Sequence, residues 1–182
     1  GIVTGLQPST EYNFKVILHD PDGLQAEQSI SASTALSPDM GLPPTGRVIT
    51  VSNTATLLQA IRNVQPGDTI ELTPGTYSTT LTISASGTAS KPITLKGSVA
   101  QLATVMSNGS GPLLTITGSH IRVRDLSLTN GGTGVVISGN TDDVQIKGLH
   151  ISGVYSGISA KGGHTNLVIH NNLLEGQTEP GD

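Results

Sequence analysis

The sequence has no cysteine and no tryptophan, and it has only one phenylalanine and three tyrosines among its 182 residues. Without cysteine, the chain can form no disulfide and no zinc or iron–sulfur centre held by thiolates. Aromatic residues make up only 2% of the chain, so a hydrophobic core has to be built from Val, Ile, Leu and Ala. The absence of cysteine leaves the cellular compartment open, because many secreted bacterial proteins also lack disulfides.

Charge and long apolar runs are scarce as well. Charged residues account for 12% of the chain, and the net charge is only −4. This balance gives no basic footprint for nucleic acid, so we expect no nucleic-acid partner. No apolar run approaches the roughly 18 residues that a membrane span needs, so we expect no membrane span. The chain starts at Gly1 without a Met or a signal segment, and we expect it to be a processed form or a fragment.

Glycine is abundant, with 23 residues, and many short runs of β-branched residues lie between the glycines. This mixture favours an all-β fold that is rich in turns. In the first 36 residues, Glu11–Leu18 and Glu27–Ala35 both alternate apolar and polar side chains, as half-buried strands do. The turn signal Asp20–Gly23 lies between them. These residues therefore predict a β-hairpin.

The residues around the first of these runs also resemble a known module. Gly5–Val16 follows the pattern G-L-x-P-x-T-x-Y-x-F-x-V, which resembles the final third of a fibronectin type III domain. The resemblance implies a partial β-sandwich over residues 1–36, in which Tyr12 is the tyrosine-corner residue. It implies a spacer, or a module that binds carbohydrate or protein, and we favour the spacer. Residues 37–46 hold three prolines and two glycines and predict a linker.

A different pattern begins at residue 47. Asn53 or Thr54 can cap a helix over Thr54–Val64, because a short side-chain oxygen accepts from the free N–H groups of the first turn. Pro66–Asp68 should end this helix. Short strands are predicted around it, at Arg47–Ser52, Thr69–Leu72, Thr80–Ile83 and Pro92–Leu95, with a turn at Pro74–Gly75.

The second half of the chain repeats itself. Ile121–Leu128, Val144–Ile151 and Leu167–Leu174 align at a constant offset, since 144 − 121 and 167 − 144 both equal 23. A repeat of this length suits a leucine-rich repeat or a β-solenoid, and the leucine-rich consensus is absent. In a β-solenoid each coil bonds to the next, and an end coil needs a cap. We therefore predict an all-β parallel β-helix over residues 47–182, with about 23 residues per coil and a capping helix at its N-terminal end.

Three motifs carry a resemblance to a family. The runs Gln65–Ile70, Pro74–Tyr77 and Gly87–Thr94 are similar to the cap and first coil of the right-handed parallel β-helix proteins of the pectin-lyase-like superfamily. The likeness is greatest to secreted bacterial polysaccharide lyases of the alginate, chondroitin and pectate lyase kind. It implies that the chain is part of an enzyme that cleaves a uronate-containing polysaccharide by β-elimination. It also implies an acidic polysaccharide as partner and a secreted or cell-surface location in a bacterium. The cation in the full-length protein is either Ca²⁺ or an Arg or Lys side chain. We expect a monomer.

A uronate lyase needs a base to remove the proton beside the carboxylate and a cation to neutralise that carboxylate. In the enzymes that the chain resembles, these groups lie on the middle coils, so we expect the catalytic residues beyond Asp182. Within the chain, the offset of 23 stacks Arg124, Lys147 and His170. This outward ladder is a candidate binding site for the acidic polymer, with a merely solvated polar face as the alternative.

Two further features have a structural and a functional interpretation. Asp142 and Asp143 are weak candidates for Ca²⁺ ligands, and a capped turn explains them as well. Asn171 and Asn172 are assigned to one rung of an asparagine ladder. His120, His150 and His164 have no partner pattern that the sequence makes visible, and no cofactor site is evident in the chain.

Other function classes remain open at this point. A non-catalytic β-helix adhesin or surface protein fits the same scaffold, and so does a β-helix glycosidase or a uronate epimerase. Basic residues and clustered Asp on later coils would favour a lyase, whereas paired Asp on adjacent coils would favour a hydrolase. We expect this chain by itself to be inactive as a lyase.

Overall fold

The computed structural model describes residues 11–19, 25–33, 46–107 and 109–176. The chain divides into two compact units, Gly1–Leu42 and Pro43–Asp182. In the first unit, β1 (Glu11–His19) and β2 (Gln25–Ser33) form an antiparallel hairpin, with Phe14 opposite Ile30. The predicted hairpin is thus confirmed. The turn Asp20–Gly23, the residues before Glu11 and the linker up to residue 45 lie outside the described residues, so the fibronectin type III assignment stays a prediction.

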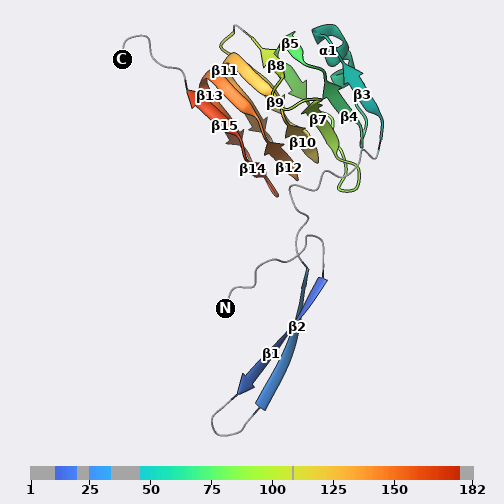
Figure 1. The fold of residues 1–182 in the computed structure, drawn as a ribbon, viewed down its shortest axis with the longest axis vertical. Coiled ribbons are helices and arrows are strands. Elements are labelled where there is room, and N and C mark those ends of the chain that lie inside the picture. The colour runs from blue at the N-terminus through green and yellow to red at the C-terminus, as the bar shows by residue number, and fades with distance from the viewer. Residues whose placement is uncertain (1–10, 20–24, 34–45, 108, 177–182) are drawn as a thin grey trace. The chain divides into compact units, whose positions relative to one another are not determined.

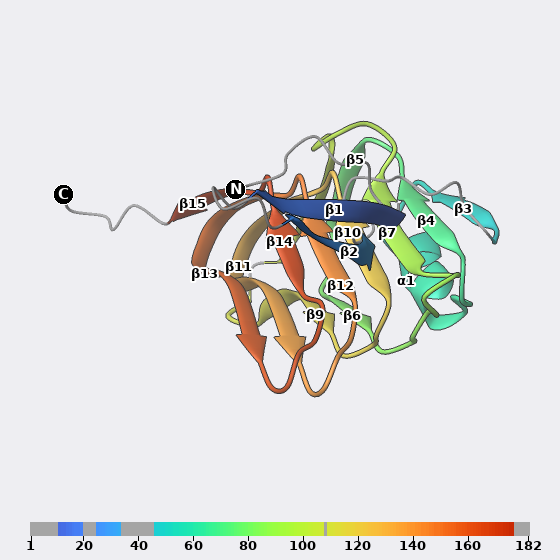
Figure 2. The ribbon, with the colours of Figure 1, turned by 90° about the horizontal axis from the view of Figure 1, so that it is seen from below.

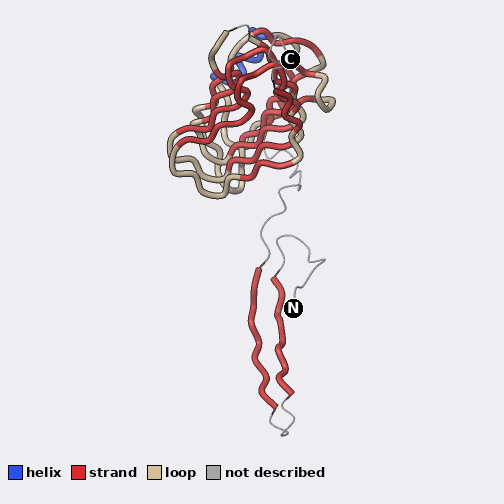
Figure 3. Tube along the Cα trace, turned by 90° about the vertical axis from the view of Figure 1, so that its left-hand side faces the viewer, coloured by secondary structure: helices blue, strands red, loops and turns tan. Residues whose placement is uncertain are grey.

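The second unit is a parallel β-helix whose strands stack coil upon coil (Figures 1 and 2). Its first sheet has six parallel strands, in the spatial order β14 (Val168–His170), β12 (Val144–Lys147), β10 (Ile121–Arg124), β7 (Ile93–Gly97), β4 (Thr69–Leu72) and β3 (Val48–Val51). The second sheet has β15 (Leu173–Gly176), β13 (His150–Lys161), β11 (Ser127–Ser138), β8 (Ala103–Met106) and β5 (Gly75–Ser78), and it also takes in β9 (Pro112–Ile116) and β6 (Leu81–Ile83). Figure 3 shows the resulting walls of parallel strands.

The repeat of 23 residues appears as strand register. Val123 pairs with Ile146, and Leu128 pairs with Ile151, each across a parallel ladder. At the corner directly after β10, β12 and β14, one residue has a left-handed backbone, with φ 60° at Asp125, 64° at Gly148 and 53° at Asn171. Asp, Gly and Asn tolerate this conformation better than other residues, so their recurrence at this offset follows from the shape of the coil.

The core is a stack of aliphatic side chains inside the coils. Ile70, Leu95, Val123 and Ile146 are almost fully buried in one column of paired positions. Tyr77 is the aromatic side chain of this core, and its hydroxyl donates to the carbonyl oxygen of Val51 at 2.9 Å. As the low aromatic content of the sequence predicts, the core consists almost entirely of aliphatic side chains.

A short helix covers the first coil. The helix α1 (Thr54–Arg62) begins after Asn53, whose Oδ1 accepts from the backbone N–H of Thr56 at 3.0 Å. Its side chain Leu57 is buried, and α1 lies beside β3, β4 and β6 (Figure 1). The predicted cap is confirmed, although the helix ends at Arg62 rather than at Val64.

The strands β5 and β8 were not expected from the sequence. Pro74–Gly75 predicts only a turn, whereas Gly75 opens β5 and pairs with Ala103 at the start of β8. The described residues contain no helix of the length and apolarity that a membrane crossing requires.

Candidate functional site

Four basic side chains occupy the same position on successive strands of the first sheet. Lys96 pairs with Arg124, Arg124 with Lys147, and Lys147 with His170. We call these four residues the cationic column. Because neighbouring strands lie about 4.8 Å apart, the column presents one basic group for each coil at that spacing.

The alternation of the strands explains why these side chains face outward. In β10, Ile121 and Val123 are buried in the core, and Arg122 and Arg124 between and after them are only partly covered. The sequence predicted that Arg124, Lys147 and His170 stack, and the structure brings these three together in one column. Whether the column binds a polymer is a separate question, which the register alone leaves as a hypothesis.

Lys96 was missed because its offset differs from the repeat. Its separation from Arg124 is 28 residues (124 − 96), since the loop that joins β7 to β8 is longer than the corner that joins β10 to β11. The signal that could have found it is the alternation of Ile93, Leu95 and their polar neighbours, which matches the alternation of β10.

Two polar atoms of the column are buried without a hydrogen-bond partner among the described residues. They are Nε of Arg124 and Nε2 of His170. Buried polar groups are nearly always satisfied in folded proteins, and exceptions mark strain or a site of function. The outward positions of these strands therefore differ from the inward positions of the same strands, which carry buried aliphatic side chains.

One carboxylate continues the column toward the cap. Glu71 on β4 pairs in register with Lys96, and its Oε1 lies 2.7 Å from Nζ of Lys96. Both side chains are about three-quarters covered, with exposed fractions of 23% and 25%. Thr50 on β3 follows Glu71 at the next position. Among the described strands, the charged part of this face thus runs from Glu71 to His170.

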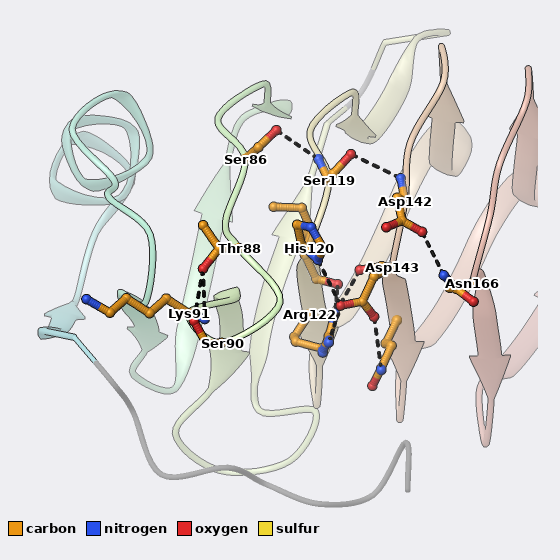
Figure 4. Close-up of polar contacts among 12 residues, drawn as sticks. Ser86, Thr88, Ser90, Lys91, Ser119, His120, Arg122, Asp142, Asp143 and Asn166 are labelled. Carbon is orange, nitrogen blue, oxygen red and sulfur yellow. Dashed lines mark hydrogen bonds and ion pairs between the residues drawn. The ribbon is translucent and has the colours of Figure 1, made fainter. Parts of the chain in front are cut away.

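A second polar cluster lies beside the column, and Figure 4 shows His120 and Arg122 both directed at Asp143. Asp143 Oδ2 accepts from Nη2 of Arg122 at 2.7 Å and lies 3.0 Å from Nδ1 of His120. Arg122 also donates through Nη1 to the backbone oxygen of Asp143 at 2.8 Å. The charge of Arg122 is thereby offset, and Asp143 is committed to a bond between neighbouring coils.

Asp142 has partners of its own in the next coil. Its Oδ1 accepts from Oγ1 of Thr165 at 2.6 Å and from Nδ2 of Asn166 at 2.8 Å. These hydrogen bonds, that from Thr165 first, hold the pKa of Asp142 below its usual value. Its backbone N–H donates to Oγ of Ser119, whose own N–H donates to Oγ of Ser86, each at 3.0 Å (Figure 4). A seam of short polar side chains therefore joins successive coils at this corner.

Both aspartates have protein partners in this arrangement, and their role as Ca²⁺ ligands stays a prediction. Calcium takes six to eight oxygen ligands, and the oxygens of Asp142 and Asp143 are directed at different partners. Within the described ranges, no group of three or more His, Asp or Glu side chains could hold a metal ion. The capped-turn interpretation of these two residues accounts for their contacts.

Two further histidines also bridge neighbouring coils. His150 Nε2 lies 2.7 Å from Glu175 Oε2, and His164 Nδ1 lies 2.9 Å from Thr141 Oγ1. Stepping along the repeat would have found Thr141, because 164 − 141 equals 23. Such a pair is found from the sequence only when each polar residue is compared with the residue 23 positions away.

The asparagine rung is present for one residue. Asn172 Oδ1 accepts from the backbone N–H of Leu149 at 2.9 Å, and its Nδ2 donates to the backbone oxygen of Ile146 at 3.1 Å. The residue at the equivalent position one coil earlier is Leu149 itself, so the rung does not extend into a ladder through that coil. Asn171 instead occupies the left-handed corner position.

Comparison with known proteins identifies relatives of the β-helix unit. Residues 51–170 match the family model described as chondroitinase B. The structure is similar to that of an alginate lyase from Paenibacillus sp. strain FPU-7, with a TM-score of 0.61 and 28% identity over 69% of this chain and 44% of that one. It is also similar in fold to the PL6 family alginate lyase AlyGC, with a TM-score of 0.51 and 16% identity over 86% of this chain and 27% of that one. A search of the curated proteins found no match. The chain thus spans less than half the length of either lyase.

Proposed function

The chain belongs to the chondroitinase B family, and from this premise we propose that the whole protein is a polysaccharide lyase that cleaves a uronate-containing polysaccharide by β-elimination. The match over residues 51–170 is the observation that carries the proposal. The likeness to the Paenibacillus alginate lyase, at 28% identity, supports the same class of enzyme.

The role that we propose for this chain is to hold the polymer. The carboxylates of an acidic polysaccharide can meet Arg124, Lys147 and His170 of the cationic column, because these groups recur at the strand spacing of about 4.8 Å. Arg124 can bind a carboxylate through two parallel N–H bonds, and Lys147 acts as a compact point charge. A polymer lying along the column would then be bound at several sites at once.

The catalytic step itself is proposed for residues after Asp182. Arg122 and His120, a cation and a candidate base that lie together, are both directed at Asp143 rather than outward at a substrate. The proposal extends to secretion or exposure at a bacterial surface, and to a monomer. A Ca²⁺ requirement of the whole protein stays a prediction, and the described residues give it no site.

The experiment that tests the proposal has two parts. The whole protein is mixed with alginate, pectate or chondroitin, and the ultraviolet absorbance of the unsaturated product is followed. Turnover of one of these polymers is expected, whereas the present chain alone should give none. Failure of the whole protein on all three would contradict the lyase proposal and favour the adhesin. Release of saturated products would favour a glycosidase, and a change of uronate stereochemistry without cleavage would favour an epimerase.

Binding by the chain is measured separately. Titration calorimetry with each polymer should show weaker binding after Arg124→Gln. Lys161→Gln is the matched control, because Lys161 is an exposed basic residue at the end of β13 in the other sheet. Equal losses for the two variants would mean that binding depends on the overall charge of the chain rather than on the column.

A further inference from the structure

The cationic column ends in a carboxylate of the protein itself. Glu71 occupies the position next to Lys96, and its Oε1 lies 2.7 Å from the ammonium nitrogen of Lys96. Arg124, Lys147 and His170 continue the column in the other direction. In place of a fifth basic group, the sheet thus has a group with the same charge as the polymer proposed to bind there.

We propose that Glu71 ends the polysaccharide-binding track. Its carboxylate takes the place of a sugar carboxylate on Lys96, so that a bound acidic chain extends over His170, Lys147 and Arg124 and stops there. This inference rests on the proposed function, since it concerns the polymer that the column binds.

Two physical arguments support a stop rather than a further subsite. A sugar carboxylate brought to Lys96 would face the charge of Glu71 at close range, and like charges placed together disfavour one binding register against others. The pair is also about three-quarters covered, with exposed fractions of 23% and 25%, so salt screens it less than a fully exposed pair. Lys96 is therefore neutralised by the protein before any polymer arrives.

The stop lies on the side of the capping helix. The position that follows Glu71 on the next strand, β3, is occupied by Thr50, which carries no charge. The helix α1 lies beside β3 and β4. A polymer that bound past Lys96 would find no further basic group on this column among the described strands. Glu71 thus sets the length of polymer that the column engages and the coil at which it ends.

The test uses Glu71→Gln in the full chain and a series of acidic oligouronates of increasing length. Calorimetry on the wild-type chain should show affinity that rises with length and then levels off. In Glu71→Gln, the length at which affinity levels off should increase, with binding of the longer oligosaccharides about two- to fivefold tighter, the range of a partly exposed ion pair. Glu175→Gln is the control, because it removes the same charge from β15 in the other sheet.

A second variant keeps the inference testable if Glu71→Gln folds poorly. Lys96→Gln should leave the length at which affinity levels off unchanged, since no sugar carboxylate reaches Lys96 in the wild-type chain, whereas Arg124→Gln should weaken binding at every length. An affinity that levels off at a shorter length in Lys96→Gln would mean that Lys96 binds a sugar carboxylate, and it would overturn the inference. So would an equal gain in Glu71→Gln and Glu175→Gln at every length. In both cases the proposed binding role would stand, and it would fail only if the wild-type chain bound none of the oligosaccharides.

Discussion

Asp68 and Arg47 are joined side chain to side chain, with Nη2 of Arg47 2.6 Å from Oδ2 of Asp68 and Nε 3.1 Å from Oδ1. The backbone N–H groups of Arg47 and Gln65 also donate to this carboxylate. Asp68 is buried, and it therefore ties the residue before β3 to the turn that follows the capping helix. These contacts, led by the Arg47 side chain, hold the pKa of Asp68 below its usual value.

Replacing Asp68 with Asn should lower the free energy of unfolding of the β-helix unit at neutral pH. It should also make that free energy fall less as the pH is lowered. At neutral pH we expect a loss of about 1–2 kcal/mol, toward the low side for a charged hydrogen bond because Arg47 is 61% exposed. A carboxyl whose folded pKa is lowered stabilises fully above its unfolded pKa of about 3.9, and this stabilisation declines as the pH falls through the folded pKa. Urea unfolding followed by circular dichroism should show the gap between wild type and Asp68→Asn closing in acid. A gap that stays constant with pH would contradict the assignment.

Tyr77 offers a second test of the first coil. Its hydroxyl lies 2.9 Å from the carbonyl oxygen of Val51 and 3.0 Å from that of Thr73, inside the core. Tyr77→Phe removes this donor while keeping the ring, so we expect a loss of about 1–2 kcal/mol in the free energy of unfolding. Tyr77→Ala also leaves a cavity and should cost about 3–5 kcal/mol. Equal stability of the Phe variant and the wild type would mean that the hydroxyl contributes nothing.

Two neighbouring glycines should respond differently to a methyl group. A Cβ on Gly132 would lie 1.8 Å from the backbone oxygen of Ser110, whereas a Cβ on Gly111 would meet nothing within 4 Å. Gly132→Ala forces the strands apart, and a loss of about 1–3 kcal/mol or more is expected. Gly111→Ala should be neutral or stabilise by about 0.4–1 kcal/mol, because it restricts the unfolded chain. Thermal unfolding of both variants makes the comparison, and similar values would show that the coils tolerate the overlap.

The repeat could be predicted from the sequence for a physical reason. Parallel coils of equal length place equivalent residues side by side. The buried residues Val123 and Ile146, which pair across two strands, are therefore 23 positions apart in the sequence. The capping helix was also visible, because Asn53 satisfies the free N–H of Thr56 through local spacing alone.

Other features depend on geometry that the sequence does not express. The longer loop after β7 places Lys96 28 residues before Arg124 instead of 23, so only the pairing of the strands shows that the two residues are neighbours. The contact between His120 and Asp143 follows the repeat, since 143 − 120 equals 23, but the offset had been applied to the strands and not to the corners between them. Polar pairs between coils were therefore the part of the site that reasoning from the sequence missed.

The final prediction concerns how Arg124 and Lys147 act together. They hold the same position on adjacent strands, so a polymer that contacts one contacts the other. Each single change to Gln should weaken the binding of an acidic polysaccharide and reduce its dependence on salt, because fewer counterions are released when fewer charges pair. The double variant should lose less than the sum of the single losses if one rigid segment of polymer spans both groups, because the loss of either contact already weakens the other. Calorimetry at several salt concentrations measures both effects, with Lys161→Gln as the control on the other sheet. An unchanged salt dependence in all variants would show that the polymer binds elsewhere.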